Sequence, residues 1–287
     1  MYEFVQQQAN LFPVNLLCEV IGISRSCYYS YISGQSHKPA KGKEDTVKLV
    51  VETFLEHKRR YGSRRLVKAL HQEGHRVSRY LAGKILTHHA LSAIQPRSFV
   101  PRTTNSGHTL GFSPNLLITQ GLPIGPNQVW VSDITYLMLS NGRWAYLATW
   151  MDLWSRRVVG WHLDENMEDR LVVTAFVRAV LGRQPAPGLI VHSDRGGQYA
   201  SKEFRRLLAK YHCQQSMSRR DDPYDNAFAE SYWSRLKAEL IEGGAFLSLD
   251  DARIEIGDYI DNYYNTIRLH SALGYLSPSQ FELQTKR

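Results

Sequence analysis

The chain is poor in cysteine and contains no long apolar run, and each shortage excludes a class of protein. Its three cysteines, Cys18, Cys27 and Cys213, form no CxxC pair, which argues against a disulfide framework and against a structural zinc site. No stretch of about 18 apolar residues occurs, so we expect no membrane span. The first residues lack a basic start followed by an apolar stretch, so we expect no signal peptide and a cytoplasmic protein.

Positive charge is unevenly distributed along the 287 residues, a length that suggests two or three domains. The net charge is +8, yet residues 1–120 hold 16 Lys and Arg against 7 Asp and Glu, whereas residues 121–287 hold 19 against 20. This asymmetry favours a nucleic-acid-binding N-terminal region joined to a nearly neutral second region. Charge alone is equally compatible with a solvated basic surface.

Residues 1–36 carry the pattern of a helix-turn-helix. Gly22 can adopt the turn conformation that other residues resist, and Ser24 can cap a second helix that carries Arg25 and Ser26. This second helix is positioned to enter a major groove, so we expect Arg25 and Ser26 to contact DNA. The first helix is marked by an apolar stripe at helical spacing: Leu16, Leu17, Val20 and Ile21.

Residues 43–95 repeat the theme and predict a second DNA-binding domain. We expect a helix over 44–57, another over 63–73 that Gly74 ends, and a third that Ser78 begins. The inner face of the third helix is formed by Leu81, Ile85 and Leu86. Five cations are expected to be phosphate or base contacts: Arg64, Arg65, Arg76, Arg79 and Lys84. A bundle that merely packs on the rest is the alternative, but two helix-turn-helix patterns within the region of excess charge favour DNA binding.

Residues 96–126 indicate a linker, because proline and glycine interrupt every helical period. The pattern then changes to segments rich in β-branched and aromatic residues, which predict strands over 128–137, 143–153, 156–164, 189–192 and 214–217. Helices are expected over 169–181, 201–211, 226–241 and 249–265. Three antiparallel strands, a crossover helix, a fourth strand and further helices describe an RNase H-like α/β fold with a mixed sheet. We assign it to residues 127–270, followed by a C-terminal tail over 271–287.

Three acidic residues carry the strongest functional signal. Asp133 and Asp194 are separated by 60 residues, and Asp194 and Glu230 by 35. Asp133 lies in an otherwise apolar strand, where an unpaired carboxylate is costly, so it needs a cation or strong hydrogen bonds. Asp194 follows a short apolar strand, and Glu230 lies on a helix. Each alone is most simply a turn, cap or solvated residue, but together they predict carboxylates that hold two divalent cations for phosphoryl transfer on DNA.

The helix that carries Glu230 presents three more polar side chains on the same face. Asn226 stands four residues before Glu230, Ser234 four residues after it and Lys237 seven residues after it. We therefore expect Asn226, Ser234 and Lys237 to contact the DNA whose scissile phosphate meets the metals.

Six further segments carry a family pattern: 60–65, 130–136, 152–161, 192–199, 264–273 and 277–281. They resemble the D-D-35-E integrase core that retroviral integrases share with bacterial insertion-sequence transposases. The chain is most similar to the second-reading-frame (OrfB) transposase of the insertion-sequence-three family, and the resemblance covers essentially the whole sequence.

The resemblance implies that Asp133, Asp194 and Glu230 bind two Mg²⁺ ions, for which Mn²⁺ is expected to substitute. One ion would activate the nucleophile and the other would steady the leaving 3′ oxygen. The nucleophile would be water in end cleavage and a DNA 3′-OH in strand transfer, with no covalent protein intermediate. The implied substrates are the terminal inverted repeats of the element and its target DNA, and Lys237 matches a basic residue proposed to touch the transposon end.

Several neighbours of these motifs have two readings. Arg195 is expected either to contact DNA or to pair with an acid. Arg268 and His270 are more often packing residues at a helix end than ligands, but the family pattern raises the chance of a DNA contact. Asp152 could be mistaken for the second acid, yet its place in the hairpin predicts a structural role.

The resemblance also bears on cofactors and partners. Retroviral integrases carry a zinc module, but His88-His89 has no nearby cysteine pair, so we expect no zinc. In the family that the chain resembles, a first-frame (OrfA) protein usually supplies a leucine zipper. Because no heptad run is visible here, an OrfA protein, separate or fused, is an expected partner. Two DNA ends must be brought together, so we expect a homo-oligomer, at least a dimer on DNA, in the bacterial cytoplasm and at the nucleoid when bound.

Two other functions remain open at this point. A nuclease of the RNase H type would cut without joining, and that class commonly uses four carboxylates. A transcriptional regulator with an inactive core would bind DNA only. The basic N-terminal domains and the segment 264–281 favour transposition over the first, and the complete acid triad favours it over the second.

Overall fold

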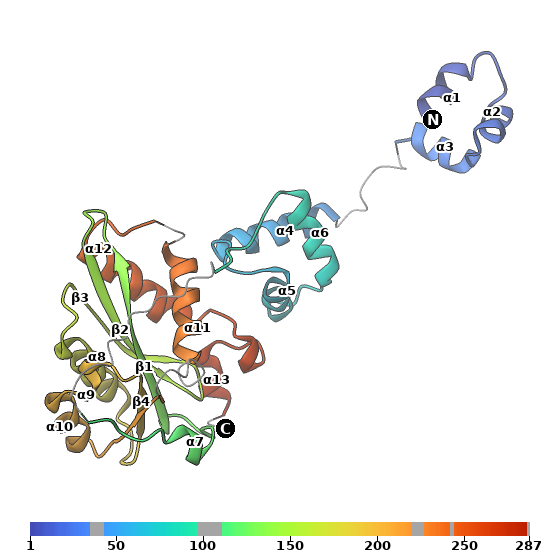
Figure 1. Ribbon diagram of the computed structural model, residues 1–287. Helices are drawn as coiled ribbons and strands as arrows, with labels where there is room; N and C mark the ends of the chain where they lie inside the picture. Colours follow the sequence, from blue (N-terminus) through green and yellow to red (C-terminus); the bar gives the residue numbers. More distant parts are fainter. Residues whose placement is uncertain (35–42, 97–110, 220–226, 242–243, 286–287) are drawn as a thin grey trace.

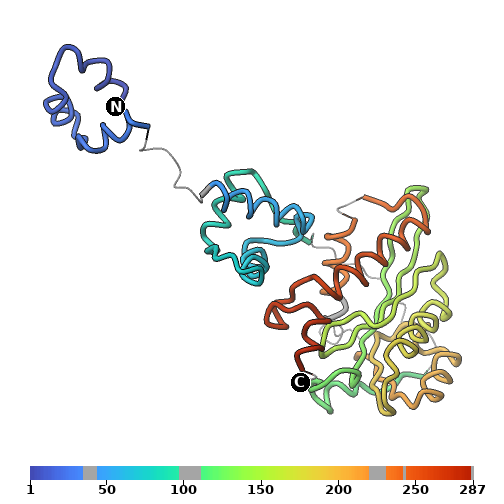
Figure 2. Tube along the Cα trace, turned by 180° about the vertical axis from the view of Figure 1, so that it is seen from behind, coloured from blue at the N-terminus to red at the C-terminus, as the bar shows by residue number. Residues whose placement is uncertain are grey.

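The computed structural model describes residues 1–34, 43–96, 111–219, 227–241 and 244–285. A small helical unit, a helical domain and an α/β core follow one another along the chain, and the helical domain lies between the other two (Figure 1, Figure 2). Within these residues, every helix is too short or too polar to cross a membrane.

A five-stranded mixed sheet organises the core, in the order β3-β2-β1-β4-β5. The strands β1, β2 and β3 pair antiparallel, and β1, β4 and β5 pair parallel. The turn between β1 and β2 uses Gly142 at φ +79°, a conformation that glycine adopts without strain. This order confirms the predicted RNase H-like fold. The bounds are β1 Val129–Met138, β2 Trp144–Asp152, β3 Val158–Asp164, β4 Ile190–Ser193 and β5 Gln214–Met217.

Helices cover both faces of the sheet. On one face, α8 and α10 pack with Trp130 and Trp150, and on the other, α11 and α12 pack with Val131. Because successive side chains of a strand point to opposite faces, Asp133 lies on the α11 face, with Val131. The core helices are α7 Leu117–Gln120, α8 Asp169–Arg183, α9 Gly197–Ala200, α10 Lys202–Lys210, α11 Ala227–Leu236, η2 Lys237–Ile241, α12 Leu249–Gly257, η3 Asp258–Tyr264, η4 Ser271–Leu273 and α13 Pro278–Gln284.

The C-terminal part of the core differs from the prediction in two ways. The helices expected over 226–241 and 249–265 each change from α-helix to π-helix, at η2 and η3. The expected tail contains α13, whose buried Glu282 forms ion pairs with Arg183 and Arg157. Residues 278–284 therefore pack on the core, because a buried carboxylate needs those partners.

The N-terminal unit contains the predicted turn but not the predicted apolar face. Gly22 adopts φ +74°, and the Ser24 side chain accepts a hydrogen bond from Cys27 N, as expected. However, Leu16 and Val20 are 48% and 78% exposed, so only half of the predicted stripe points inward. The small core consists of Val5, Leu17, Cys18 and Tyr28. Its helices are α1 Tyr2–Gln8, α2 Val14–Ile21 and α3 Arg25–Ile32.

The helical domain closely follows its prediction. Gly74 takes φ +89° after the second helix, and Ser78 Oγ caps the third by accepting from Leu81 N at 3.2 Å. Ile85 and Leu86 are buried as expected, but Leu81 is 41% exposed, so it does not belong to the inner face. The helices are α4 Lys43–Glu56, α5 Ser63–Gln72 and α6 Arg79–His88.

The described part of the expected linker, residues 111–126, runs beside the sheet edge at β5. Leu116 N donates to Ser216 Oγ, and Ser113 Oγ donates to Gln215 Oε1, each at 2.9 Å. These bonds tie the segment to the core.

Close packing of β3 against α8 depends on Gly160. A Cβ at this position would lie 2.5 Å from the Ala175 carbonyl oxygen and 2.6 Å from Ala179 Cβ. We expect Gly160→Ala to lower the free energy of unfolding by about 1–3 kcal/mol, because overpacking forces backbone shifts. Urea denaturation measures this change. The control Gly182→Ala, where a Cβ meets no atom within 4 Å, should leave stability unchanged or raise it, and equal losses in both variants would contradict the packing argument.

Candidate active site

Parallel pairing of β1 with β4 brings Asp133 and Asp194 side by side. Val131 is paired with His192 in this ladder, and each aspartate follows two residues later on its own chain segment. Neighbouring strands lie about 4.8 Å apart, so two residues beyond a paired position the chains are still neighbours. The sheet register therefore brings together two aspartates that have 60 other residues between them in the sequence.

The buried Tyr199 hydroxyl gives independent support for this proximity. It lies 2.8 Å from Ser132 Oγ, between the sheet and α9. Burial raises the pKa of Tyr199, and the charges of Asp194 and Asp133 raise it further. Both carboxylates thus act on the same hydroxyl, which stays neutral.

Backbone N–H groups orient both carboxylates. Asp133 Oδ1 accepts a hydrogen bond from Ile134 N at 2.8 Å, and Asp194 Oδ1 accepts one from Gly196 N at 3.0 Å. Both aspartates are half-buried. Paired carboxylate oxygens held in this way suit a hard, oxygen-preferring cation such as Mg²⁺.

A buried histidine holds β4, the strand that directly precedes Asp194. His192 Nδ1 lies 2.8 Å from Ser216 Oγ and its Nε2 lies 3.2 Å from Ser218 Oγ, so the ring bridges β4 to β5 and the residue after it. Tyr199, Ser132 and His192 were not predicted as site residues. All three stand within the motifs 130–136 and 192–199, which was the available signal.

Helix α11 brings Lys237 to the same place. It packs against β1, and Lys237 follows its last residue, with Nζ 4.4 Å from the Tyr136 ring centroid. Burial lowers the pKa of Lys237, whereas the charge of Asp133 raises it. Lys237 therefore lies beside Asp133.

The third acid is placed only by its backbone. Glu230 lies in α11, seven residues before Lys237, but its side chain is outside the described residues. Among the described side chains, no three of His, Cys, Asp or Glu gather as a metal site, and Glu230 is not among them. Asn226 also lies outside the described residues, and Ser234 is exposed.

Asp152 has the structural role that the sequence predicts. It is fully buried and accepts hydrogen bonds from Asn127 N at 2.6 Å, Trp154 N at 3.0 Å and Ser155 N at 2.9 Å. Its carboxylate thus closes the loop after β2, and burial raises its pKa.

The cations expected to contact DNA fall into two groups. Seven of the predicted contact residues are exposed: Arg25, Ser26, Arg64, Arg76, Arg79, Lys84 and Ser234. Arg195 is half-buried, stacks on Phe112 and donates to the Ser218 carbonyl oxygen at 2.8 Å. Arg65 is half-buried. Arg268 is only 1% exposed and paired with Glu239, so the expected DNA contact of Arg268 is corrected to an internal ion pair.

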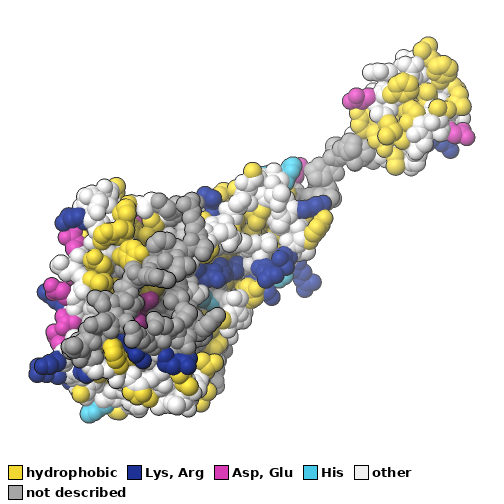
Figure 3. Space-filling model, viewed as in Figure 1, with side chains coloured by type: hydrophobic (Ala, Val, Ile, Leu, Met, Phe, Trp, Pro, Cys, Tyr) yellow, Lys and Arg dark blue, Asp and Glu magenta, His cyan; other side chains and the backbone are white. Residues whose placement is uncertain are grey.

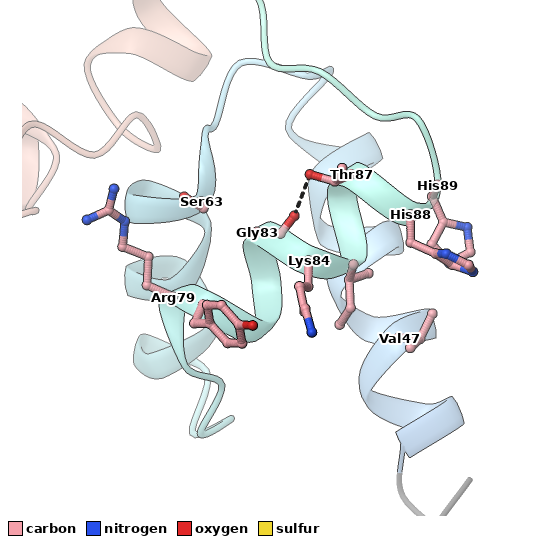
Figure 4. Close-up of a pocket in the computed structure, with 10 residues that line it drawn as sticks. Val47, Ser63, Arg79, Gly83, Lys84, Thr87, His88 and His89 are labelled. Atoms are coloured by element: carbon pink, nitrogen blue, oxygen red, sulfur yellow. Dashed lines mark hydrogen bonds between the residues drawn. The ribbon is translucent and has the colours of Figure 1, made fainter. Parts of the chain in front are cut away.

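Exposed cations concentrate on the helical domain (Figure 3). A hollow of about 1140 Å³ there is lined by Arg79, Lys84, His88 and His89 among others, and the labelled side chains lie around it in Figure 4. By contrast, residues 1–34 hold Arg25 as their one basic residue, against Glu3 and Glu19. The charge excess therefore belongs to the chain after residue 34, and DNA binding by 1–36 stays a prediction that charge does not support.

Comparisons with known proteins match both large parts of the chain. Two models of an integrase core domain match residues 124–223 and 211–278, and a model of an HTH-like domain matches residues 42–99.

Two curated relatives extend over most of this length. The chain is 41% identical over 229 residues to the transposase for insertion sequence element IS904 of Lactococcus lactis subsp. lactis (strain IL1403), which covers 80% of this chain and 90% of the relative. It is 35% identical over 283 residues to transposase InsF for insertion sequence IS3A of Escherichia coli (strain K12), with 98% of each covered. Among solved structures, the HTLV-2 integrase catalytic core domain in complex with magnesium (trimeric form) is similar at 19% identity and a TM-score of 0.43, over 55% of this chain and 98% of that chain.

Proposed function

Because this chain belongs to the IS3 family of insertion-sequence transposases, with an integrase core and an HTH-like domain, we propose that it cleaves the 3′ ends of its element and joins them to target DNA. The observation that supports this proposal is the β1–β4 register, in which Asp133 on β1 and Asp194 just after β4 are neighbours, while α11 packs against β1. Glu230 on α11 is the third member of the proposed acid triad.

The three acids are proposed to hold two Mg²⁺ ions. The donor set is entirely carboxylate oxygen, which fits this cation. Bound ions supply activation of the attacking oxygen and charge neutralisation at the leaving 3′ oxygen. The hydrogen bonds from Ile134 N and Gly196 N keep the carboxylates of Asp133 and Asp194 in one orientation while DNA binds and dissociates.

Lys237 is proposed to hold the DNA backbone at the site. Its ammonium group lies beside Asp133 and over the Tyr136 ring, so its charge is fixed close to the reacting phosphate. Water serves as nucleophile for end cleavage and a DNA 3′-OH for strand transfer, and no covalent protein intermediate forms.

Binding of double-stranded DNA is assigned to the helical domain. Arg64, Arg79 and Lys84 are exposed on α5 and α6, where phosphates can reach them. Two element ends must be held together during joining, so we propose at least a dimer on DNA.

The first test uses DNA that carries both element ends, with Mg²⁺ or Mn²⁺. We expect metal-dependent 3′ nicks and joined products from the wild-type chain, resolved on sequencing gels. Glu230→Gln and Asp133→Asn should lower the rate at least about 100-fold, because even residues behind metal ligands cost 10–100-fold when changed. Glu203→Gln, an exposed carboxylate on α10, is the control and should be unaffected. Nicks without joined products would support a nuclease instead, and DNA binding without cleavage would support a regulator.

Metal binding by Asp194 is testable without activity. A Cβ at Gly196 would lie 3.1 Å from both Asp194 Oδ1 and Gln198 Oε1, and the backbone at Gly196 suits any residue. We expect Gly196→Ala to weaken Mn²⁺ binding about 10-fold, because it crowds the carboxylate. Calorimetric titration with Mn²⁺ measures this, with Gly182→Ala as control. An unchanged affinity would argue against Asp194 as a ligand.

The role of the helical domain predicts a salt-dependent effect. We expect Arg79→Ala with Lys84→Ala to weaken double-stranded DNA binding and to reduce the slope of log K against log salt by about 1.8, at roughly 0.9 per lost phosphate contact. Fluorescence anisotropy across a salt series measures the slope. Arg253→Ala on α12, which removes a cation paired with Asp250, should leave it unchanged. An unchanged slope in the double variant would place the DNA elsewhere.

A further inference from the structure

A buried ion pair fastens the helix that carries Glu230. Arg268 Nε donates to Glu239 Oε2 at 2.8 Å, and its Nη2 donates to Oε1 at 2.5 Å. The two side chains are 1% and 6% exposed. Burial raises the pKa of Glu239, but the hydrogen bonds and charge of Arg268 outweigh it, so the pKa is lowered and the carboxylate stays ionised.

The pair acts at an irregular turn of this helix. Glu239 lies two residues after Lys237 in η2, the π-helical turn that continues α11. Tyr259 Oη of the second π-helix, η3, donates to Glu239 Oε2 at 2.9 Å, so the two π-helices share one hydrogen bond. Isolated π-turns are rare and frequently mark functional sites. Here the Glu239 side chain ties the π-turn to Arg268 and Tyr259.

The helical domain reaches the same turn. Arg60 Nε donates to the Glu239 carbonyl oxygen at 3.2 Å, and its guanidinium lies 4.4 Å from the Tyr263 ring centroid. Tyr61 Oη donates to the Ile267 carbonyl oxygen at 3.3 Å and accepts from Leu269 N at 2.8 Å. The segment around Arg268 is therefore bonded both to η2, through Glu239, and to the helical domain, through Tyr61.

Stability alone is a weak reason for such a pair. Taking two charges out of water costs several kcal/mol per ion, and apolar residues of similar volume often replace a buried pair without loss of stability. Removing a single partner is strongly destabilising, because it leaves one buried charge unpaired. A pair of this kind does fix geometry, since its hydrogen bonds form in only one arrangement.

We propose that the Glu239–Arg268 pair is a positioning device that sets the rotation and depth of α11, and thereby the placement of Glu230 and Lys237 against Asp133 and Asp194. This inference rests on the proposed function of the acid triad. Neither Glu239 nor Arg268 needs to touch DNA or metal, because both act through the backbone of η2 and α11.

The test replaces both partners at once, Glu239→Met with Arg268→Met, so that no buried charge remains. We expect a cooperatively folded protein whose single-turnover cleavage rate falls about 100-fold, the cost of a displacement near 1 Å. DNA affinity should stay within about twofold of wild type, since the exposed cations of α5 and α6 are unchanged. Peptides covering residues 231–241 should exchange amide hydrogen faster, and Mn²⁺ should bind more weakly.

A second buried pair serves as a matched control. Arg183 and Glu282 form an ion pair at 2.8 Å between α8 and α13, and the more exposed Arg157 also pairs with Glu282 at 3.1 Å. Arg183→Met with Glu282→Met should leave the cleavage rate and exchange over 231–241 at wild-type values. An equal loss of rate in both double variants would mean general loosening and would overturn the proposal. So would a wild-type rate with unchanged exchange in the Glu239/Arg268 variant.

Two further readouts keep the outcomes distinct. If the double variant does not fold, the Tyr259→Phe variant replaces it, because this change removes only the hydrogen bond to Glu239. We expect faster amide hydrogen exchange over residues 231–241 in this variant. Unchanged exchange would overturn the proposal. If the wild-type chain cleaves no DNA, the proposed function fails, whereas exchange and Mn²⁺ affinity of the variants still report whether the pair positions α11.

Discussion

Register between two parallel strands is the constraint on which the rest of the site depends. If the pairing of β1 with β4 slipped by one residue, the Asp133 side chain would move to the other face of the sheet and away from Asp194. Two packed clusters hold that register, since Trp130 is buried on one face and Val131 on the other. The proximity of the two aspartates is thus a consequence of how the core packs. The backbone hydrogen bonds to Asp133 and Asp194 then adjust only the orientation of their carboxylates.

Charge is used in two different ways along the chain. On the helical domain, cations such as Arg79 and Lys84 stay in water, where they are available to phosphate at little cost. Within the core, Arg268 and Arg183 are desolvated and each binds one glutamate. The same residue type is therefore exposed at the surface, where we propose that it binds DNA, and paired inside, where we propose that it fixes geometry.

The sequence predicted most elements and the two described aspartates because period, turn residues and spacing are local signals. Gly22, Gly74 and Ser78 each have the predicted role, since their effect depends on a few neighbouring atoms. The exposure of Val20 and Leu81 was not predictable in this way, because a short helix has several apolar residues and tertiary contacts decide which face is covered. The π-turns were missed for a related reason: contacts such as the bond from Tyr259 to Glu239 join residues that are far apart in the sequence, and no local pattern indicates them.

The segment 264–270 shows why the family pattern misassigned Arg268. Its Tyr, Asn, Arg and His are the residues that often line a nucleic-acid surface, yet all are mostly buried. Asn265 bonds both the N–H and the carbonyl of Val158 at 2.9 Å, which clamps η3 to β3, and Arg268 clamps η2. Burial and the nearby charge of Arg268 lower the pKa of His270 to about 2, so this ring stays neutral and is unsuited to proton transfer near pH 7. The polar residues of this segment therefore join the elements around the candidate site, and the carboxylates on those elements are the groups that we propose to carry the chemistry.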